Sequence, residues 1–181
     1  MLWLLLAATV IAAPGAGPVT VRDVTGQSRT LLAPARGRVD LLFFVNRECP
    51  ISNRYAPEIT RICRDYASRG VQCTLVYADR TTTPASVAAH RKEFALAPNA
   101  TAVIDDGRLT TAIDATVTPE AAIYTSDGRQ YRGRIDNLYL DVGRMQRAAT
   151  VHDVRDALDA IARGTAVRAR ETEPIGCTIE R

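Results

Sequence analysis

The 181-residue sequence has few of the side chains that build metal sites and nucleic-acid interfaces. It contains two histidines, His90 and His152, and neither forms a Cys–His cluster with zinc-finger spacing, which argues against a structural zinc site. The net charge is only +3, with acidic residues between the arginines, so no basic groove for nucleic acid is predicted. Repeats and low-complexity tracts are also missing, and the composition is that of a globular domain.

The longest apolar run lies at the N-terminus. Residues 2–13 are apolar or small, and no charge precedes Arg22. Because a bilayer-spanning helix needs ~20 residues, the sequence predicts a secretory signal peptide over residues 1–17. The segment lacks the basic start that signals usually carry, so an uncleaved membrane anchor is the alternative. Both interpretations predict a periplasmic or secreted protein, with a domain over residues 18–164 and a C-terminal tail over residues 165–181.

Strand patterns open the predicted domain. Residues 19–24 alternate apolar and polar side chains, and residues 29–32 form a second short strand after a turn. Val39–Val45 is almost continuously apolar, which is typical of a central strand buried on both faces. Residues 53–68 then have helical spacing, and residues 71–78 return as a second core strand. This strand, helix, strand order predicts a parallel pair with a right-handed connection.

The second half of the chain continues with helices and a hairpin. A helix is predicted from Pro84, and residues 99–115 are expected to hold a short strand and a helix whose bounds the pattern does not define. In residues 120–135 two strands flank an Asp-Gly pair, which is a strong hairpin signal. A final helix is predicted over residues 151–163, and an extended tail follows.

Cys49 lies between the buried strand and the helix pattern. Unpaired backbone N–H groups and the helix dipole favour negative charge at a helix N-terminus, and the thiolate is the reactive form of cysteine. Pro50 supplies a fixed φ that suits a first helical turn. Pro57 would cost ~3 kcal/mol inside a regular helix, so a kinked or restarted helix is predicted. The alternative is a helix that begins only at Pro57, with Cys49 in an ordinary loop.

Three features in order give the chain a family resemblance. They are Cys49 at a strand-to-helix junction, Pro57 eight residues later, and Thr118-Pro119 directly before the hairpin. Over residues 19–164 the chain resembles thioredoxin-fold proteins of the redoxin, or peroxiredoxin-like, group (the alkyl hydroperoxide reductase and thiol-specific antioxidant type). The resemblance implies an α/β thioredoxin-like fold: a central mixed sheet flanked by helices, with an N-terminal strand extension and an extended C-terminal tail. It also implies a cis bond before Pro119, beside the reactive cysteine.

The chain departs from the family pattern at three positions. Ser52 stands where a dithiol enzyme has its second cysteine, so a CxxC dithiol is excluded. Phe43 stands where thioredoxins carry a buried acid, six residues before the first cysteine. Asn46 stands three residues before Cys49, where peroxiredoxins place a Thr or Ser that orients the peroxide.

The resemblance also implies a set of supporting residues around Cys49. An arginine that stabilises the thiolate is expected from Arg132 or Arg134, with ordinary exposed strand arginines as the alternative. The full set of candidate supporting residues comprises Asn46, Pro50, Ser52, Asn53, Thr118, Pro119, Arg132 and Arg134.

Four cysteines in an oxidising compartment favour disulfides. Measured along the helix axis, Cys63 lies ~7.5 Å before Ser68, and Cys73 lies ~10 Å along the returning strand. The two cysteines are therefore at similar distances from the turn and lie opposite one another, which predicts a structural Cys63–Cys73 disulfide. Two separate buried thiols are the alternative, because free cysteine behaves as a small core residue.

Cys177 is then the candidate resolving cysteine for Cys49. From the end of the last helix at Gly164, the extended tail reaches up to ~40 Å, so distance is no obstacle. Gly176 allows the backbone to approach closely. The alternative is a disordered tail whose thiol pairs between molecules or not at all.

Three functions remain open at this point. The first is an extracytoplasmic thiol–disulfide oxidoreductase or peroxiredoxin-like enzyme, with Cys49 as nucleophile and Cys177 as resolving residue. It would act on a peroxide or on a protein or small-molecule disulfide, with a thiol electron donor and no cofactor. The second is a copper-binding protein of the Sco type, with Cys49, Cys177 and His90 as ligands. The third is a non-catalytic binding domain of the same fold. No resident metal and no nucleic-acid partner are expected, and a membrane is a partner only for an uncleaved N-terminal anchor.

Overall fold

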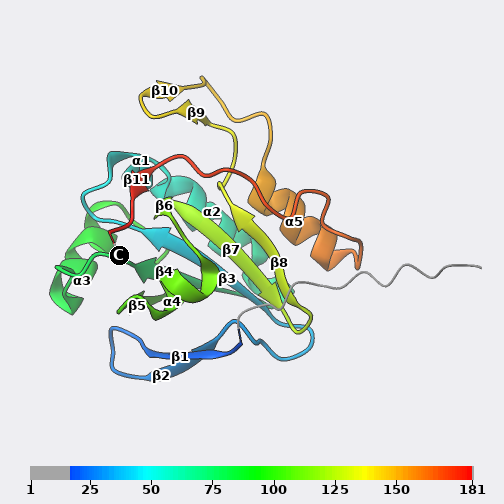
Figure 1. Ribbon diagram of the computed structural model, residues 1–181, viewed down its shortest axis with the longest axis horizontal. Helices are drawn as coiled ribbons and strands as arrows, with labels where there is room; N and C mark the ends of the chain where they lie inside the picture. The colour runs from blue at the N-terminus through cyan, green and yellow to red at the C-terminus, as the bar shows by residue number, and fades with distance from the viewer. Residues whose placement is uncertain (1–16, 181) are drawn as a thin grey trace, which may run out of the picture.

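The computed structural model describes residues 17–180, which fold around one five-stranded mixed sheet (Figure 1). The strands lie in the spatial order β5-β4-β3-β7-β8. β3, β4 and β5 are parallel, whereas β7 and β8 are antiparallel to their neighbours. Their bounds are β3 Val39–Val45, β4 Val71–Tyr77, β5 Thr101–Ile104, β7 Glu120–Thr125 and β8 Gly128–Gly133. The predicted signal segment, residues 1–17, lies outside the described residues except for Gly17.

The central position of β3 follows from its sequence. All seven of its residues are buried, because its side chains alternate between two apolar layers. Phe43 contributes to the core on one face of the sheet, and Phe44 contributes to the core on the opposite face. The predicted central strand over Val39–Val45 is confirmed.

Helices cover both faces of this sheet. On the Phe43 side the apolar stripes of three helices close the larger core: α2 (Ala56–Tyr66), α3 (Pro84–Glu93) and α5 (Asp153–Ala162). On the Phe44 side α4 (Arg108–Ile113) closes the smaller core together with the N-terminal strands. The 3₁₀ turn η1 (Ala67–Arg69) links α2 to β4 through Gly70, which has a φ of 80°. No helix within residues 17–180 has the length and apolar character needed to cross a bilayer.

The N-terminal extension is a hairpin of β1 (Val19–Arg22) and β2 (Ser28–Leu31). The first strand ends earlier than predicted because the Asp23 carboxylate accepts the backbone N–H groups of Thr25 and Gln27, at 2.9 and 3.0 Å, and so forms a turn. Asp23 also bridges to Val103 of β5, which attaches the hairpin to the edge of the main sheet.

The second half of the chain follows the predicted order with one addition. β7 and β8 flank the Asp127-Gly128 turn as predicted, and residues 99–115 contain β5 and α4. An exposed hairpin of β9 (Tyr139–Asp141) and β10 (Arg144–Met145) stands away from the sheet (Figure 1). The sequence analysis missed this hairpin because its strands are too short to show a period.

The tail returns from α5 across the molecule to the region of α1 (Pro50–Arg54), as Figure 1 shows. Its last strand, β11 (Cys177–Thr178), pairs antiparallel with β6 (Val117–Thr118), the short strand before β7. The C-terminal end of the chain is therefore brought beside the start of the first helix.

A disulfide joins Cys63 of α2 to Cys73 of β4, with their Cα atoms 5.7 Å apart. Both side chains are buried, at 5% and 9% exposure. The disulfide ties the helix to the neighbouring strand across the turn at η1, a location that suits a structural role.

We expect the double substitution Cys63→Ala/Cys73→Ala to lower the free energy of unfolding by roughly 2–3 kcal/mol, because the bond closes a short loop in the unfolded chain. Urea unfolding of the oxidised proteins measures the change. Mass spectrometry of the variant should still show the Cys49–Cys177 disulfide, which is the control for correct folding. An unchanged unfolding free energy would contradict a structural role.

Candidate active site

Cys49 is the N-cap residue of α1, at the junction between β3 and the first helix. Pro50 is the first residue of α1, where its missing N–H leaves no hydrogen bond unmade. The helix stops at Arg54 and restarts as α2 at Ala56, because Pro57 has no N–H for the preceding turn. The restarted helix is the arrangement predicted from Pro57. The alternative, a helix that begins only at Pro57, is wrong.

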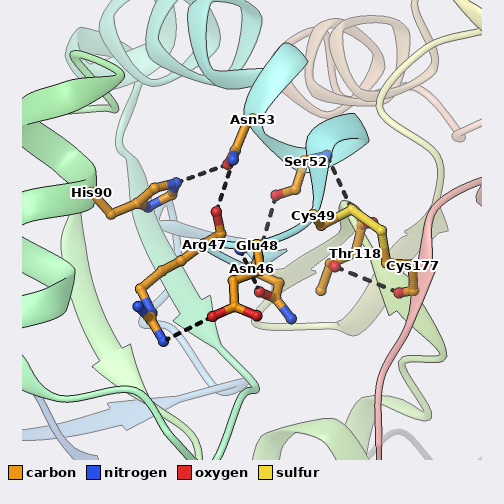
Figure 2. The surroundings of a disulfide bond; sticks show 9 residues. All are labelled: Asn46, Arg47, Glu48, Cys49, Ser52, Asn53, His90, Thr118 and Cys177. Carbon is orange, nitrogen blue, oxygen red and sulfur yellow. Dashed lines mark hydrogen bonds and ion pairs between the residues drawn. A yellow bond between two sulfur atoms is a disulfide. The ribbon is translucent and has the colours of Figure 1, made fainter.

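Hydrogen bonds from two asparagines hold the loop before Cys49. The side-chain oxygen of Asn46 accepts the N–H of Glu48 at 2.8 Å, and its carbonyl accepts the N–H of Cys49 at 3.3 Å. The side-chain amide of Asn53 donates to the carbonyl of Arg47 at 2.8 Å (Figure 2). Both residues therefore shape the loop. The side-chain oxygen of Asn46 is therefore already used by a backbone N–H of this loop, that of Glu48.

Ser52, at the position of a second CxxC cysteine, is buried beside Cys49. Its backbone N–H points at Sγ of Cys49, with N and Sγ 3.4 Å apart. Its hydroxyl accepts the N–H of Asn46 at 3.3 Å (Figure 2). Once Cys49 is reduced, a backbone donor in this position favours a negatively charged sulfur.

The Thr118–Pro119 peptide bond is cis, as the resemblance implied. The carbonyl oxygen of Thr118 lies 3.1 Å from Sγ of Cys49. Thr118 is buried, and its hydroxyl donates to the carbonyl of Cys177 at 3.5 Å. Cys49 and Thr118, which are 69 positions apart along the chain, are thus brought together at one sulfur.

A disulfide joins Cys49 to Cys177, with their Cα atoms 6.0 Å apart (Figure 2). These are the two cysteines that the sequence analysis paired. The β11 strand places Cys177 opposite Thr118 of β6, and the N–H of Ile179 donates to the carbonyl of Thr116 at 2.9 Å. Cys49 is only 1% exposed, because the tail covers it in this oxidised state.

Gly176 makes this close approach possible. A Cβ atom at Gly176 would lie 2.1 Å from the carbonyl oxygen of Thr118 and 3.1 Å from the nitrogen of Pro119. Both atoms belong to the backbone of the strand that the tail pairs with, so they cannot move aside as a flexible side chain would. The tail can lie at this distance only with glycine before Cys177.

A second contact, which we call the tail clamp, holds residues 170–172 on β8. The N–H of Arg132 donates to the carbonyl of Arg170 at 3.0 Å, and the N–H of Thr172 donates to the carbonyl of Arg132 at 3.1 Å. The Thr172 hydroxyl oxygen also accepts the N–H of Arg134 at 3.1 Å. A Cβ at Gly133 would lie 2.1 Å from the Thr172 carbonyl, so the tail is packed closely here as well.

The structure gives Arg132 and Arg134 carboxylate partners rather than Cys49. Arg132 forms ion pairs with Glu171 of the tail and, at 3.1 Å, with Asp114. Arg134 pairs with Asp153 at 2.8 Å, which ties β8 to the start of α5. The expectation that one of these arginines stabilises the thiolate is therefore not supported, because Arg132 is engaged with Asp114 and the tail, and Arg134 is engaged with α5.

Glu120, which the sequence analysis did not single out, is fully buried directly after Pro119. One carboxylate oxygen accepts the backbone N–H groups of Thr116 and Val117, at 2.8 and 3.4 Å, and so orders β6. The other oxygen faces Nε of Arg132 at 3.7 Å. Burial raises the pKa of this carboxyl above its usual range. The signal in the sequence was a charged residue inside the apolar strand after Pro119.

A buried histidine supports the loop through Asn53. Nε2 of His90 lies 2.8 Å from the side-chain oxygen of Asn53, and Nδ1 lies 2.9 Å from the hydroxyl of Tyr77. The Asn53 oxygen can only accept, so Nε2 carries the proton and Nδ1 accepts from Tyr77. This arrangement holds the neutral imidazole, and burial lowers the pKa of His90.

The same contacts bear on the copper alternative. Both ring nitrogens of His90 have hydrogen-bond partners, so neither is available as a ligand. Within the described part of the chain, no three His, Cys, Asp or Glu side chains gather as a group that could hold a metal ion. The His90 ligand required by the copper interpretation is therefore not supplied.

We expect Gly176→Ala to make the Cys49–Cys177 disulfide easier to reduce. Overpacking a close contact costs about 1–3 kcal/mol, which lowers the equilibrium constant for disulfide formation by roughly 5- to 150-fold. Titration in glutathione buffers, with alkylation and mass spectrometry to count free thiols, measures the constant. Thr178→Ala is the matched control, because that side chain is exposed and lies two residues further along the same tail segment, in β11. Equal constants for Gly176→Ala and the wild type would refute the steric argument.

The lowered pKa of His90 predicts a loss of stability in acid. The unfolded state binds a proton near the ordinary value of 6.5 before the folded state does. The stability contributed by neutral His90 is thus present above pH 6.5 and lost as pH falls below it. The free energy of unfolding of the wild type should fall more steeply below this pH than that of His90→Gln, which keeps a donor to Asn53. Parallel pH dependences in urea unfolding would count against a buried neutral imidazole.

The comparisons with known proteins identify the fold. No family model matches the chain, and no curated protein sequence matches it. The structure is similar to an uncharacterised conserved protein from Geobacillus kaustophilus (24% identity, TM-score 0.77, 93% of this chain and 90% of that one). It is also similar to a hypothetical protein from Sinorhizobium meliloti 1021, with 23% identity and a TM-score of 0.76 over 94% of each chain. A third similar structure is a secreted Mycobacterium tuberculosis disulfide oxidoreductase homologous to E. coli DsbE (18%, 0.56, 78% of this chain and 95% of that one). The chain therefore has a thioredoxin-like fold, with a mixed central sheet between helices.

Proposed function

We propose that this protein is an extracytoplasmic thiol–disulfide oxidoreductase, with Cys49 as the nucleophile and Cys177 as the resolving cysteine. The observation that carries the proposal is the disulfide between these residues, at the N-cap of α1 and beside Thr118. The two cysteines come from opposite ends of the domain and are held together by strand pairing rather than by a short loop.

The reaction begins from the reduced protein. The Cys49 thiolate, favoured by the N–H of Ser52, attacks one sulfur of a substrate disulfide, and the other substrate sulfur leaves as a thiolate. The Cys177 thiolate then attacks Sγ of Cys49 in the mixed disulfide and releases the second substrate thiolate. The substrate has gained two electrons, and the protein now carries the Cys49–Cys177 disulfide. An external thiol donor of two electrons restores the starting state.

The local contacts favour a disulfide over a peroxide as substrate. Asn46, at the position of the peroxide-orienting hydroxyl of peroxiredoxins, already uses its side-chain oxygen on the N–H of Glu48. The arginines proposed for thiolate stabilisation pair with Asp114, Glu171 and Asp153 instead. A peroxidase would need such donors at the reacting oxygen, so we place peroxide second.

An extracytoplasmic location is supported by two observations. The structure contains two disulfides, which persist in oxidising compartments. A structure of the same fold is described as a secreted disulfide oxidoreductase. These agree with the apolar N-terminal sequence over residues 2–13, which has the composition of a secretory signal.

Reduced protein should react with a small aromatic disulfide, such as 5,5′-dithiobis(2-nitrobenzoate), about tenfold faster than free cysteine does at about pH 7, because its sulfur is held as a thiolate and free cysteine is only a few per cent ionised there. Stopped-flow absorbance measures the rate, and hydrogen peroxide is tested in parallel. Cys49→Ser should remove the fast phase and leave only the slow reaction of the Cys177 thiol, at about the rate of free cysteine, whereas Cys177→Ser should complete the first step and accumulate a mixed disulfide, visible by mass.

The double variant Cys63→Ala/Cys73→Ala is the control and should keep the wild-type rate. A wild-type rate equal to that of free cysteine, or a full rate in Cys49→Ser, would overturn the proposal. A peroxide rate above the disulfide rate would replace it by the peroxiredoxin-like alternative.

A further inference from the structure

The end of the tail is seated on the site in the manner of a bound peptide. After a bend at Gly176, Cys177 and Thr178 form β11 and pair antiparallel with Thr118 and Val117. Cys177 is disulfide-bonded to Cys49, as a substrate cysteine would be in a mixed disulfide. Backbone pairing of this kind recognises any extended chain, and side-chain pockets then select among them.

One side chain of this segment borders a small cavity beside the disulfide. Ile175, two residues before Cys177, is partly buried there. The other residues that line the cavity are Tyr55, Pro119, Arg134, Ile135, Asp136 and Tyr139. Aromatic and aliphatic groups form much of this wall, and the Asp136 carboxylate accepts the hydroxyl of Tyr55 at 2.6 Å. Arg134, the cation of the wall, is already paired with Asp153, so the place of Ile175 favours another apolar side chain over a carboxylate.

The two attachments of the tail differ in what reduction does to them. The tail clamp at residues 170–172 consists of hydrogen bonds and ion pairs to β8, and these remain when the disulfide opens. β11, by contrast, loses its covalent bond to Cys49 and keeps only its two-residue pairing with β6. Cys177 comes five positions after Thr172, so the freed thiol stays within ~16 Å of the clamp. Reduction thus frees the edge of β6 and the cavity, and Cys177 remains close.

We propose that, in the reduced protein, an extended segment of a partner protein takes the place of residues 175–177. Its disulfide-bonded cysteine lies opposite Thr118, and a branched apolar side chain two residues before that cysteine takes the place of Ile175 in the wall of the cavity. The inference rests on the proposed function. Bonds change as described above: Cys49 attacks the partner's disulfide, and the tail returns with Cys177 to expel the partner's segment as a thiolate.

The surface beside the cavity also favours a polypeptide partner. Tyr139 lines the cavity and begins β9, and the β9–β10 hairpin carries Leu140, Val142 and Met145 at 47%, 68% and 44% exposure. In residues 17–180 the large exposed apolar side chains are these three and Val151. A protein that extends beyond the paired segment would cover these exposed apolar side chains, which follow Tyr139 along the chain.

The test uses full-length Cys177→Ser protein and short peptides Xaa-Gly-Cys-Thr whose cysteine is activated as the mixed disulfide with 5-thio-2-nitrobenzoate. Release of the coloured thiolate reports attack by Cys49. A peptide with Xaa = Ile should react about tenfold faster than one with Xaa = Asp, because the apolar side chain is buried in the cavity. Mass spectrometry confirms that the peptide is joined to Cys49.

A second variant tests whether the tail occupies the same place. Adding Ile175→Asp to Cys177→Ser should raise the rate with the Ile peptide several-fold, because the tail then competes poorly for the cavity. Ala166→Asp in the same background is the charge-matched control, since that side chain is exposed and lies outside both attachments of the tail. It should leave the rate unchanged.

The outcomes separate this inference from the function on which it rests. Equal rates for the Ile and Asp peptides, together with a fast reaction of the small aromatic disulfide, would overturn the proposed selection of an apolar side chain at the cavity. The proposed oxidoreductase function would still stand. If the Ile peptide reacts faster than the Asp peptide but its rate does not rise in the Ile175→Asp variant, the proposal that the tail competes for the same place is overturned. If neither the peptides nor the small disulfide reacts faster with the protein than with free cysteine, the proposed function itself fails.

Discussion

The contact between Gly176 and Thr118 is the constraint on which the site depends. A backbone without a side chain can lie against the carbonyl that also faces Sγ of Cys49, and this closeness brings Cys177 within bonding distance. The sulfur is enclosed on one side by the amide of Ser52 and on the other by the paired strands. A thioredoxin-like fold with a single cysteine at the helix start thus receives its second cysteine from the tail and not from the helix itself.

Buried polar groups hold the two partners of this contact in place. Glu120 orders β6 through the backbone N–H groups of Thr116 and Val117, and Arg132 links the same carboxylate to Glu171 of the tail. An unpaired buried carboxylate would be costly, so Glu120 and Arg132 depend on one another. The β6 strand and the tail are therefore positioned by one connected set of charges.

The sequence was sufficient for the features that depend on local pattern and chain reach. The all-buried β3 follows from periodicity, and the restarted helix follows from proline chemistry. The Cys63–Cys73 pair follows from a short distance, and Cys49–Cys177 was the remaining pair, within reach of the tail. The partners of Arg132 could not be predicted, since Asp114 and Glu171 lie 18 and 39 positions away and meet it only through the packing of the tail on β8. The role of His90 was missed for the same reason, because its partner Asn53 is 37 residues away.

The two disulfides have different roles: one stays closed as a structural cross-link, and the other opens and closes in the proposed mechanism. Cys63–Cys73 joins neighbouring elements across ten residues of chain, buried on the side of the sheet that α2 covers, and nothing in the site requires it to open. Cys49–Cys177 spans 128 residues and would restrict the unfolded chain strongly, by roughly 4–5 kcal/mol. On the proposed mechanism that contribution is lost whenever the bond is reduced. The tail clamp then keeps the tail ordered without the bond, so the resolving thiol remains close while its disulfide opens and closes.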